Sequence, residues 1–180
     1  MTRVARACAA LAIALLAWPR PAAATQTDTT ALEFGGIRAG ARLEELDQVA
    51  RRSAAKRLRC DRAKADLHVM ECRAVLKYPE LGGSLNLWVS AMDSVAGVIT
   101  LSSDVTADQL GRWRESIERR YGRVDPQVQG TQSMMQWVRH GRMLRLTWRI
   151  EHGQRTASVS LVDGPVLDAW GKGRARSPGS

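Results

Sequence analysis

The sequence lacks the motifs that mark the common enzyme classes. It contains no nucleophile elbow, no His-Glu-x-x-His zinc motif, no phosphate-binding loop and no paired-carboxylate signature. Its three histidines, His68, His140 and His152, have no serine, cysteine or acidic companion in a known catalytic pattern. We therefore expect a non-enzymatic protein without a cofactor. An enzyme with an unfamiliar active site is the alternative, because such a site leaves no motif.

Long apolar runs are also scarce, and the longest lies near the N-terminus. Two arginines precede the apolar run 7–18, and three alanines follow at 22–24, which is the order of a signal peptide and its cleavage site. We predict a signal peptide at 1–24, cleaved near Ala24, and export to the periplasm or the medium. Cys8 lies inside the apolar run, which disfavours a lipid-anchored cysteine. No stretch is long and uncharged enough for a comfortable membrane span, so a membrane-spanning protein is not expected.

Cysteine is rare, and only Cys60 and Cys72 remain after the leader. An even pair in an oxidising compartment predicts one disulfide, which would tie the end of the first helix to the next strand. The alternative is a metal site in which His68 is joined by Asp61 or Asp66. Four ligands at familiar zinc spacings are not evident, so no metal is expected. A redox pair would need the closer spacing of a C-x-x-C motif.

Acidic residues are fewer than basic residues: 18 Asp and Glu stand against 27 Lys and Arg, and the formal net charge is +9. Loss of the leader removes three arginines and no acid, so the charge falls to +6. This excess attracts anionic surroundings, which makes anionic envelope polymer or lipid head groups possible partners. The basic residues are almost all Arg in an Ala-rich chain, a bias that GC-rich coding also produces. A solvated surface is therefore the simpler interpretation, and no nucleic-acid partner is expected.

One stretch carries a complete set of helix signals. Thr106 and Gln109 form a capping box, in which the two side chains satisfy free backbone amides at the helix start. Gly122 supplies a left-handed stop at the other end. Apolar residues between these signals make one stripe, namely Leu110, Trp113, Ile117 and Tyr121. The pattern predicts a helix that begins at Ala107 and covers a sheet.

After this helix the pattern changes to a period of two. Residues 142–150 and 156–162 alternate apolar and polar side chains, as strands with one buried and one exposed face do. His140-Gly141 and His152-Gly153 suit hairpin turns, because glycine tolerates a positive φ. The stretch 106–164 therefore predicts a helix followed by a three-stranded antiparallel meander.

An earlier stretch repeats this order with weaker signals. Residues 43–56 have an apolar helical face, and three strand candidates follow at 69–76, 84–92 and 95–101. Arg42 stands where Thr106 caps the later helix, so the earlier helix has a weaker start. The prediction is an α+β fold of two divergent helix-plus-three-strand units, with the helices packed on one face of an antiparallel sheet.

The repeat also predicts the limits of the domain. We expect a flexible segment at 25–34 and one α+β domain at 35–170. The two units occupy about 36–103 and 104–164, and an apolar clip at 165–170 packs on the core. A tail rich in Gly, Ser and Arg, predicted to be disordered, follows at 171–180.

The strand pattern predicts a docking surface on the other face of the sheet. If the apolar residues of 84–92 and 142–150 face the helices, the alternate residues point away from them. A face with Trp, Arg and small polar groups has the composition of a protein interface. The predicted docking residues are Asn86, Trp88, Ser90, Arg145, Thr147 and Arg149. Packing of Trp88 under a loop or in a dimer contact is the alternative.

The segment Gly-Ile-Arg-x-Gly at 36–40, followed by Leu-Glu-Glu-Leu at 43–46, resembles the outer-membrane assembly lipoproteins of the BamE (SmpA/OmlA) class. The tandem helix-plus-meander plan is also similar to the β-lactamase inhibitor protein. Two departures are Arg42, where that pattern usually has a Ser or Thr cap, and the missing lipobox. The resemblance implies a fold and a tendency to bind proteins, and no functional residue carries over. The predicted function is a non-enzymatic periplasmic or secreted binding protein that docks an envelope protein.

Overall fold

The computed structural model describes residues 31–54 and 57–175, so the predicted signal peptide at 1–24 lies outside the described residues. The first half contains α1 (Leu43–Ala54), β3 (Arg59–Arg62), β4 (Met70–Tyr78), η1 (Pro79–Leu81), β5 (Gly83–Met92) and β6 (Val95–Asp104). The second half contains α2 (Ala107–Tyr121), β7 (Gln127–Gln129), β8 (Gln132–Arg139), β9 (Arg142–Glu151) and β10 (Gln154–Asp163). A hairpin of β1 (Glu33–Phe34) and β2 (Ile37–Arg38) precedes α1, and α3 (Gly164–Ala175) follows β10.

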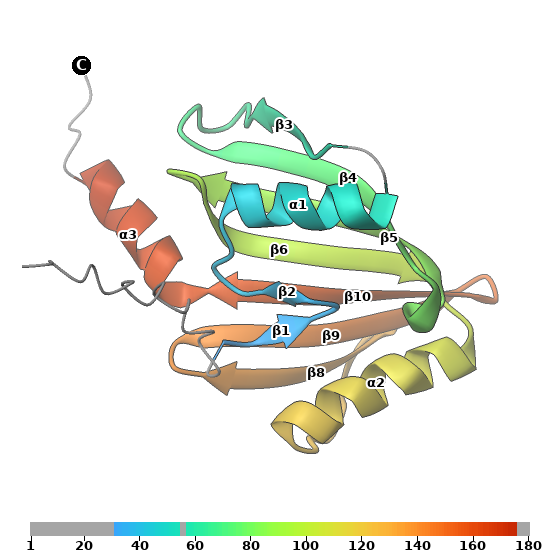
Figure 1. The fold of residues 1–180 in the computed structure, drawn as a ribbon. Helices are drawn as coiled ribbons and strands as arrows, with labels where there is room; N and C mark the ends of the chain where they lie inside the picture. The colour runs from blue at the N-terminus through green and yellow to red at the C-terminus, as the bar shows by residue number, and fades with distance from the viewer. Residues whose placement is uncertain (1–30, 55–56, 176–180) are drawn as a thin grey trace, which may run out of the picture.

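The two halves share one antiparallel sheet with the strand order β3-β4-β5-β6-β10-β9-β8-β7. Strands β6 and β10 pair at its centre and join the halves. Figure 1 shows α1 and α2 on the same face of the sheet. The predicted α+β class, with an antiparallel sheet and these helices on one face, is confirmed. The order of elements is the same in both halves, while their origin as a repeat stays a prediction.

Each half has one strand more than predicted. The short strands β3 and β7 lie at the two outer edges of the sheet, and every residue in both is exposed. Alternation between apolar and polar side chains reports burial of one face. A strand of three or four exposed residues carries no such alternation, so the sequence pattern could not reveal it.

The predicted disulfide between Cys60 and Cys72 is confirmed, with a Cα–Cα distance of 4.0 Å. It joins β3 to β4, in which the two cysteines are direct cross-strand partners. The predicted attachment to the end of the first helix is not found. Cys60 lies instead on β3, a strand that the sequence pattern does not predict. The bond also leaves neither sulfur as a thiolate, so the alternative metal site around His68 is excluded.

The N-terminal hairpin fills the space between the helices of the two halves. Leu32 and Phe34 are buried, and the Phe34 ring lies 5.2 Å from that of Trp113 on α2, centroid to centroid. Figure 1 shows β1 and β2 between α1 and α2, and β1 contacts β10 at the sheet centre. The prediction of a flexible segment at 25–34 is therefore wrong for residues 31–34, because their apolar side chains complete the core.

The Gly-Ile-Arg-x-Gly segment has a structural role at each of its named positions. Gly36 has a φ of 74° in the β1–β2 turn, and Ile37 is buried. Arg38 donates two hydrogen bonds to the carboxylate of Glu45, at 2.9 and 3.2 Å. Gly40 has a φ of 73°, and a Cβ there would collide with the Asp163 carboxylate. The segment therefore closes the hairpin and positions α1.

Helix α2 begins with the predicted capping box: the Gln109 amide donates to the Thr106 hydroxyl, and the Gln109 side chain accepts from the Thr106 amide. Its other end is tied to the hairpin by Tyr121. The Tyr121 hydroxyl accepts from the Glu33 amide at 2.7 Å and donates to the Glu33 carbonyl at 3.0 Å. Burial raises the pKa of Tyr121, so this hydroxyl keeps the proton that it donates.

The C-terminal clip is a helix and extends beyond its predicted end. Helix α3 continues to Ala175, so the predicted disordered tail at 171–180 is wrong for residues 171–175. Asp163, which is buried, starts this helix by accepting a hydrogen bond from the Val166 amide at 3.0 Å. A Cβ built on Gly97 would lie 2.7 Å from both Leu167 and Trp170, so α3 packs directly on β6. None of the helices within the described ranges has the length and apolar composition to cross a membrane.

Candidate functional site

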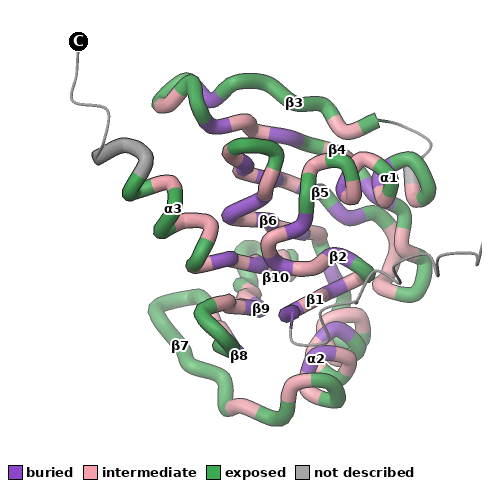
Figure 2. The backbone as a smooth tube through the Cα atoms, turned by 60° about the vertical axis from the view of Figure 1, so that its left-hand side comes forward, coloured by how far each residue is buried: buried purple, intermediate pink, exposed green. Residues whose placement is uncertain are grey.

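The face of the sheet opposite α1 and α2, called the open face below, carries a continuous row of side chains. Figure 2 shows α1 and α2 on one side of the sheet and α3 toward the other, at one end. Direct cross-strand pairing connects one residue from each of seven strands. From β3 to β8 the row reads Arg59, Arg73, Trp88, Thr100, Ser160, Arg145 and Gln136. Residues from both halves therefore meet on one surface.

All six predicted docking residues lie on the open face. They occupy β5 and β9, where they alternate with the buried residues that face the helices; they are Asn86, Trp88, Ser90, Arg145, Thr147 and Arg149. Trp88 is partly exposed, so it is not simply core. Strands β6 and β10 separate the two groups. The structure therefore places all six residues on one face, and their role in docking stays a prediction.

The centre of the open face is made of hydroxyl side chains that bond to one another. Thr100 and Ser160 share a hydrogen bond of 3.2 Å across β6 and β10, and Thr147 and Ser158 share one of 2.7 Å across β9 and β10. These side chains are small, so they project only a short distance from the sheet between β5 and β9. Thr147 is therefore committed to a neighbour and is a weaker candidate for direct docking than its position suggested.

Arg145 is oriented by its neighbour on β8. Its guanidinium donates to the Gln136 amide oxygen from two nitrogens, at 2.8 and 3.1 Å. This arrangement fixes the guanidinium plane and leaves it partly exposed. Arg149 instead forms an exposed ion pair of 3.5 Å with Glu151, which contributes little rigidity. Of the two predicted arginines, Arg145 is the better-ordered docking group.

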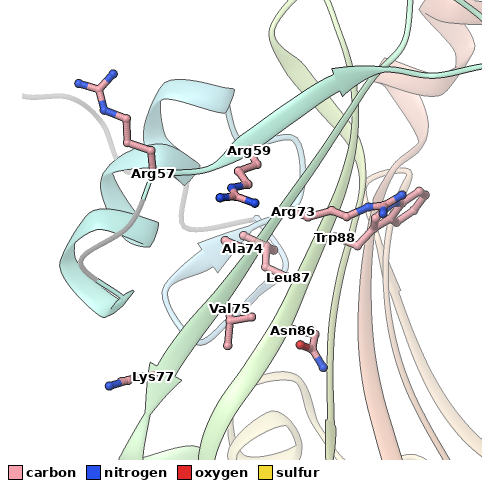
Figure 3. Close-up of a pocket in the computed structure, with 9 residues that line it drawn as sticks. All are labelled: Arg57, Arg59, Arg73, Ala74, Val75, Lys77, Asn86, Leu87 and Trp88. Atoms are coloured by element: carbon pink, nitrogen blue, oxygen red, sulfur yellow. The ribbon is translucent and has the colours of Figure 1, made fainter.

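A groove of about 680 Å³ lies where the open face meets the edge of the sheet. Strand β3 pairs only with residues 70–73 of β4, and the groove begins where this pairing ends. Figure 3 shows Arg73 and Trp88 extending to one side of the strands and Arg57 lying beside α1. The lining residues are Arg57, Arg59, Arg73, Ala74, Val75, Lys77, Asn86, Leu87 and Trp88.

The charge of the groove has one sign. Four of the described residues that line it are cationic, and none is acidic. Arg73 lies 3.5 Å from Glu71, and because the Arg73 side chain is largely exposed, this pair only weakly offsets its charge. Within the described part of the chain, Arg59 and Lys77 make no side-chain hydrogen bond or ion pair. The groove is therefore a concentrated positive region beside a tryptophan.

The segment that carries Arg57 and Arg59 is held in place by Asp47 of α1. One Asp47 carboxylate oxygen accepts from the Leu58 amide at 3.0 Å, and the other accepts from the Arg51 guanidinium at 2.9 Å. The Leu58 amide, followed by Arg51, lowers the pKa of Asp47 below its ordinary value of 3.8. The ionised carboxylate therefore stabilises the folded segment.

Replacing Asp47 with asparagine is expected to lower stability at neutral pH and to have less effect in acid. A lowered pKa means that the wild-type carboxylate stabilises the fold above about pH 4 and loses this contribution as the pH falls further. Urea unfolding of both proteins at several pH values measures the difference. A difference that stays constant from neutral pH to pH ~2 would contradict the assigned role.

None of the three histidines is among the described residues that line the groove. His140 and His152 have φ values of 48° and 52° in the turns before β9 and β10, as the predicted hairpins require. Within residues 31–54 and 57–175, no three His, Cys, Asp or Glu side chains form a group that could hold a metal ion.

Comparison of the chain with protein-family models, with curated proteins and with solved structures found no significant match. The resemblance to BamE-class lipoproteins and to the β-lactamase inhibitor protein therefore stays a prediction.

Sequence reasoning missed the four cations of the groove because it did not predict β3. One signal could have located two of them. If Cys60 and Cys72 pair as direct cross-strand partners, antiparallel register puts Arg59 opposite Arg73. The remaining two, Arg57 and Lys77, are placed by the path of the chain between α1 and β3 and by the length of β4.

Proposed function

We propose that this chain is a non-enzymatic binding protein that docks another protein on its open face. The observation that carries the proposal is the cross-strand row that contains both Trp88 and Arg145. These residues lie three strands apart, which is about 14 Å at a strand spacing of ~4.8 Å. A small ligand would not contact both side chains, whereas a protein interface of ordinary size covers that distance. Tryptophan and arginine are also enriched among the residues that dominate binding energy.

A binding role is favoured over catalysis by the chemistry of the groove. Its described lining consists of cationic, amide and apolar side chains, without a hydroxyl, a thiol, a histidine or a carboxylate. General acid–base and nucleophilic catalysis mostly use such groups, and a catalytic lysine is usually desolvated, whereas Lys77 is exposed. The groove is better suited to holding an anionic group than to transforming one.

The proposed location is the periplasm or the medium, after cleavage near Ala24, and the proposed partner is a protein of the cell envelope. The disulfide between Cys60 and Cys72 supports an oxidising compartment, because such bonds are rare in reducing ones. The order of charged, apolar and small residues at 1–24 supports export.

A second candidate function is the binding of an anionic polymer or of lipid head groups. The four cations of the groove favour it. Such binding depends on exposed charge and is expected to disappear as salt rises toward ~1 M, where the screening length is about 3 Å. Docking that depends on burial of Trp88 is expected to persist at that salt concentration.

Replacing Trp88 or Arg145 with alanine is expected to weaken capture of the partner. Each substitution removes a side chain of the hot-spot type and is expected to cost about 2 kcal/mol, or about 30-fold in affinity. The measurement is crosslinking and pull-down from envelope extract, followed by titration of the captured protein. Arg112→Ala is the matched control, because Arg112 is an exposed arginine of α2. If neither Trp88→Ala nor Arg145→Ala changes capture of the partner, the open face is not the docking surface.

A further inference from the structure

The β4 strand has a free edge beside the groove. Strand β3 covers residues 70–73, and no strand among the described residues covers 74–78 on that side. A free edge presents unpaired backbone N–H and C=O groups, which another extended chain can bind. The edge lies between the last paired residue of β3, Arg59, and the end of β4 at Tyr78.

The disulfide shows which backbone groups point outward. Cys60 and Cys72 lie only 4.0 Å apart at their Cα atoms, which is the short distance of a non-hydrogen-bonded antiparallel pair. The backbone groups of Cys72 therefore point toward β5. Because the direction alternates along a strand, those of Val75 and Lys77 point toward the free edge. Within the described chain, no hydrogen bond from outside the sheet reaches the backbone of these two residues.

The groove supplies both room and charge for a strand at this edge. Its volume of about 680 Å³ lies directly beside Val75, whose residue surface is 54% exposed. Arg59 and Arg73 flank one end of the free edge, and Lys77 lies toward the other. An added strand would place alternate side chains next to these cations, so acidic residues at every second position complement the site.

We propose that residues 74–78 of β4 bind an extended acidic segment of another protein, which adds to the sheet as a strand in line with β3. Backbone hydrogen bonds to Val75 and Lys77 hold the segment, and the groove cations select its charge. The two ends of this chain that lie outside the described residues are poor candidates to occupy the site, because residues 1–30 and 176–180 contain a single acidic residue, Asp28. This inference goes beyond docking of a folded surface, since it concerns the edge of the sheet and a different kind of contact.

Direct titration of the full mature chain with a short acetylated peptide, in which Glu alternates with Thr, tests the proposal. We expect saturable binding of this peptide. The same peptide with Gln in place of Glu is expected to bind at least about tenfold more weakly, because the charge is lost. The same peptide with alternate amides N-methylated is expected not to bind, because it cannot pair along an edge. Equal binding of the N-methylated peptide, or no binding of the Glu peptide, overturns the proposal.

Variants locate the site on the protein. Val75→Pro removes the outward N–H at a position where an edge strand accepts proline, and it is expected to abolish peptide binding. Val128→Pro, on the opposite edge strand β7, is the matched control and is expected to leave binding unchanged. If Val75→Pro does not fold, the double variant Lys77→Gln with Arg59→Gln replaces it in the test. This double variant is expected to weaken binding of the Glu peptide about tenfold. Unchanged binding by the folded Val75→Pro, or by that double variant, overturns the assignment.

The two proposals fail in different ways. Arg145 lies on β9, five strands from β3, so Arg145→Ala is expected to leave peptide binding intact while it weakens capture of a folded partner. Loss of peptide binding in Arg145→Ala would move the peptide site onto the open face and overturn the edge assignment. If Arg145→Ala binds the peptide normally and also captures the partner normally, the edge site is supported and docking on the open face is contradicted.

Discussion

Replacement of Trp113 by alanine is expected to lower the free energy of unfolding by about 3–5 kcal/mol. Trp113 is fully buried and packs on Phe34 of the N-terminal hairpin. Its indole N–H also donates to the Leu81 carbonyl of η1 at 2.7 Å. The substitution therefore creates a cavity and leaves that carbonyl without its donor, at the point where α2 meets both the hairpin and the first half of the chain.

Urea unfolding followed by far-UV circular dichroism measures this loss. Trp113→Phe separates the two causes, because it keeps a ring beside Phe34 and loses only the hydrogen bond and part of the volume. Trp88→Ala is the matched control on the open face, and we expect it to cost about 1 kcal/mol or less, since Trp88 is partly exposed. If Trp113→Ala were no less stable than Trp88→Ala, the assigned core of α2 would be wrong.

Removal of the disulfide is expected to cost about 3 kcal/mol. The bond closes a loop with a sequence separation of 12, and the chain-entropy estimate for loops of this size is about 3 kcal/mol. The functional effect is local. Strand β3 carries Arg59 and pairs with β4 over four residues, so loss of the bond frees one wall of the groove.

The double variant Cys60→Ser with Cys72→Ala tests this prediction, since Cys60 is exposed and Cys72 is buried. Its urea midpoint is expected to fall to that of the reduced wild-type protein, and its affinity for the alternating Glu peptide is expected to fall as well. Asp47→Asn tests whether any loosening of the groove weakens peptide binding, because Asp47 holds the adjacent segment through Leu58. A double variant as stable as the oxidised wild-type protein would show that β3 does not depend on the bond.

Several elements could be predicted because their signals are local. The capping box of α2 joins residues three positions apart, and the strands β9 and β10 were recognised from alternation within a few residues. The disulfide followed from counting, because only one pair of cysteines lies outside the predicted signal peptide. The face on which Trp88 and Arg145 lie followed from the same alternation, which assigns each strand residue to one side.

The amino-acid sequence by itself thus determined α1 and α2, the long strands, the faces of β5 and β9 and the cysteine pair, since these depend on near neighbours. Only the tertiary structure decided which strands pair at the centre, where the hairpin packs and which edge stays free. Arg59 and Arg73 are 14 positions apart and meet through strand pairing alone. Short exposed strands carry no periodic pattern, and contacts between distant segments leave no local signal, so the groove could be located only in the folded chain.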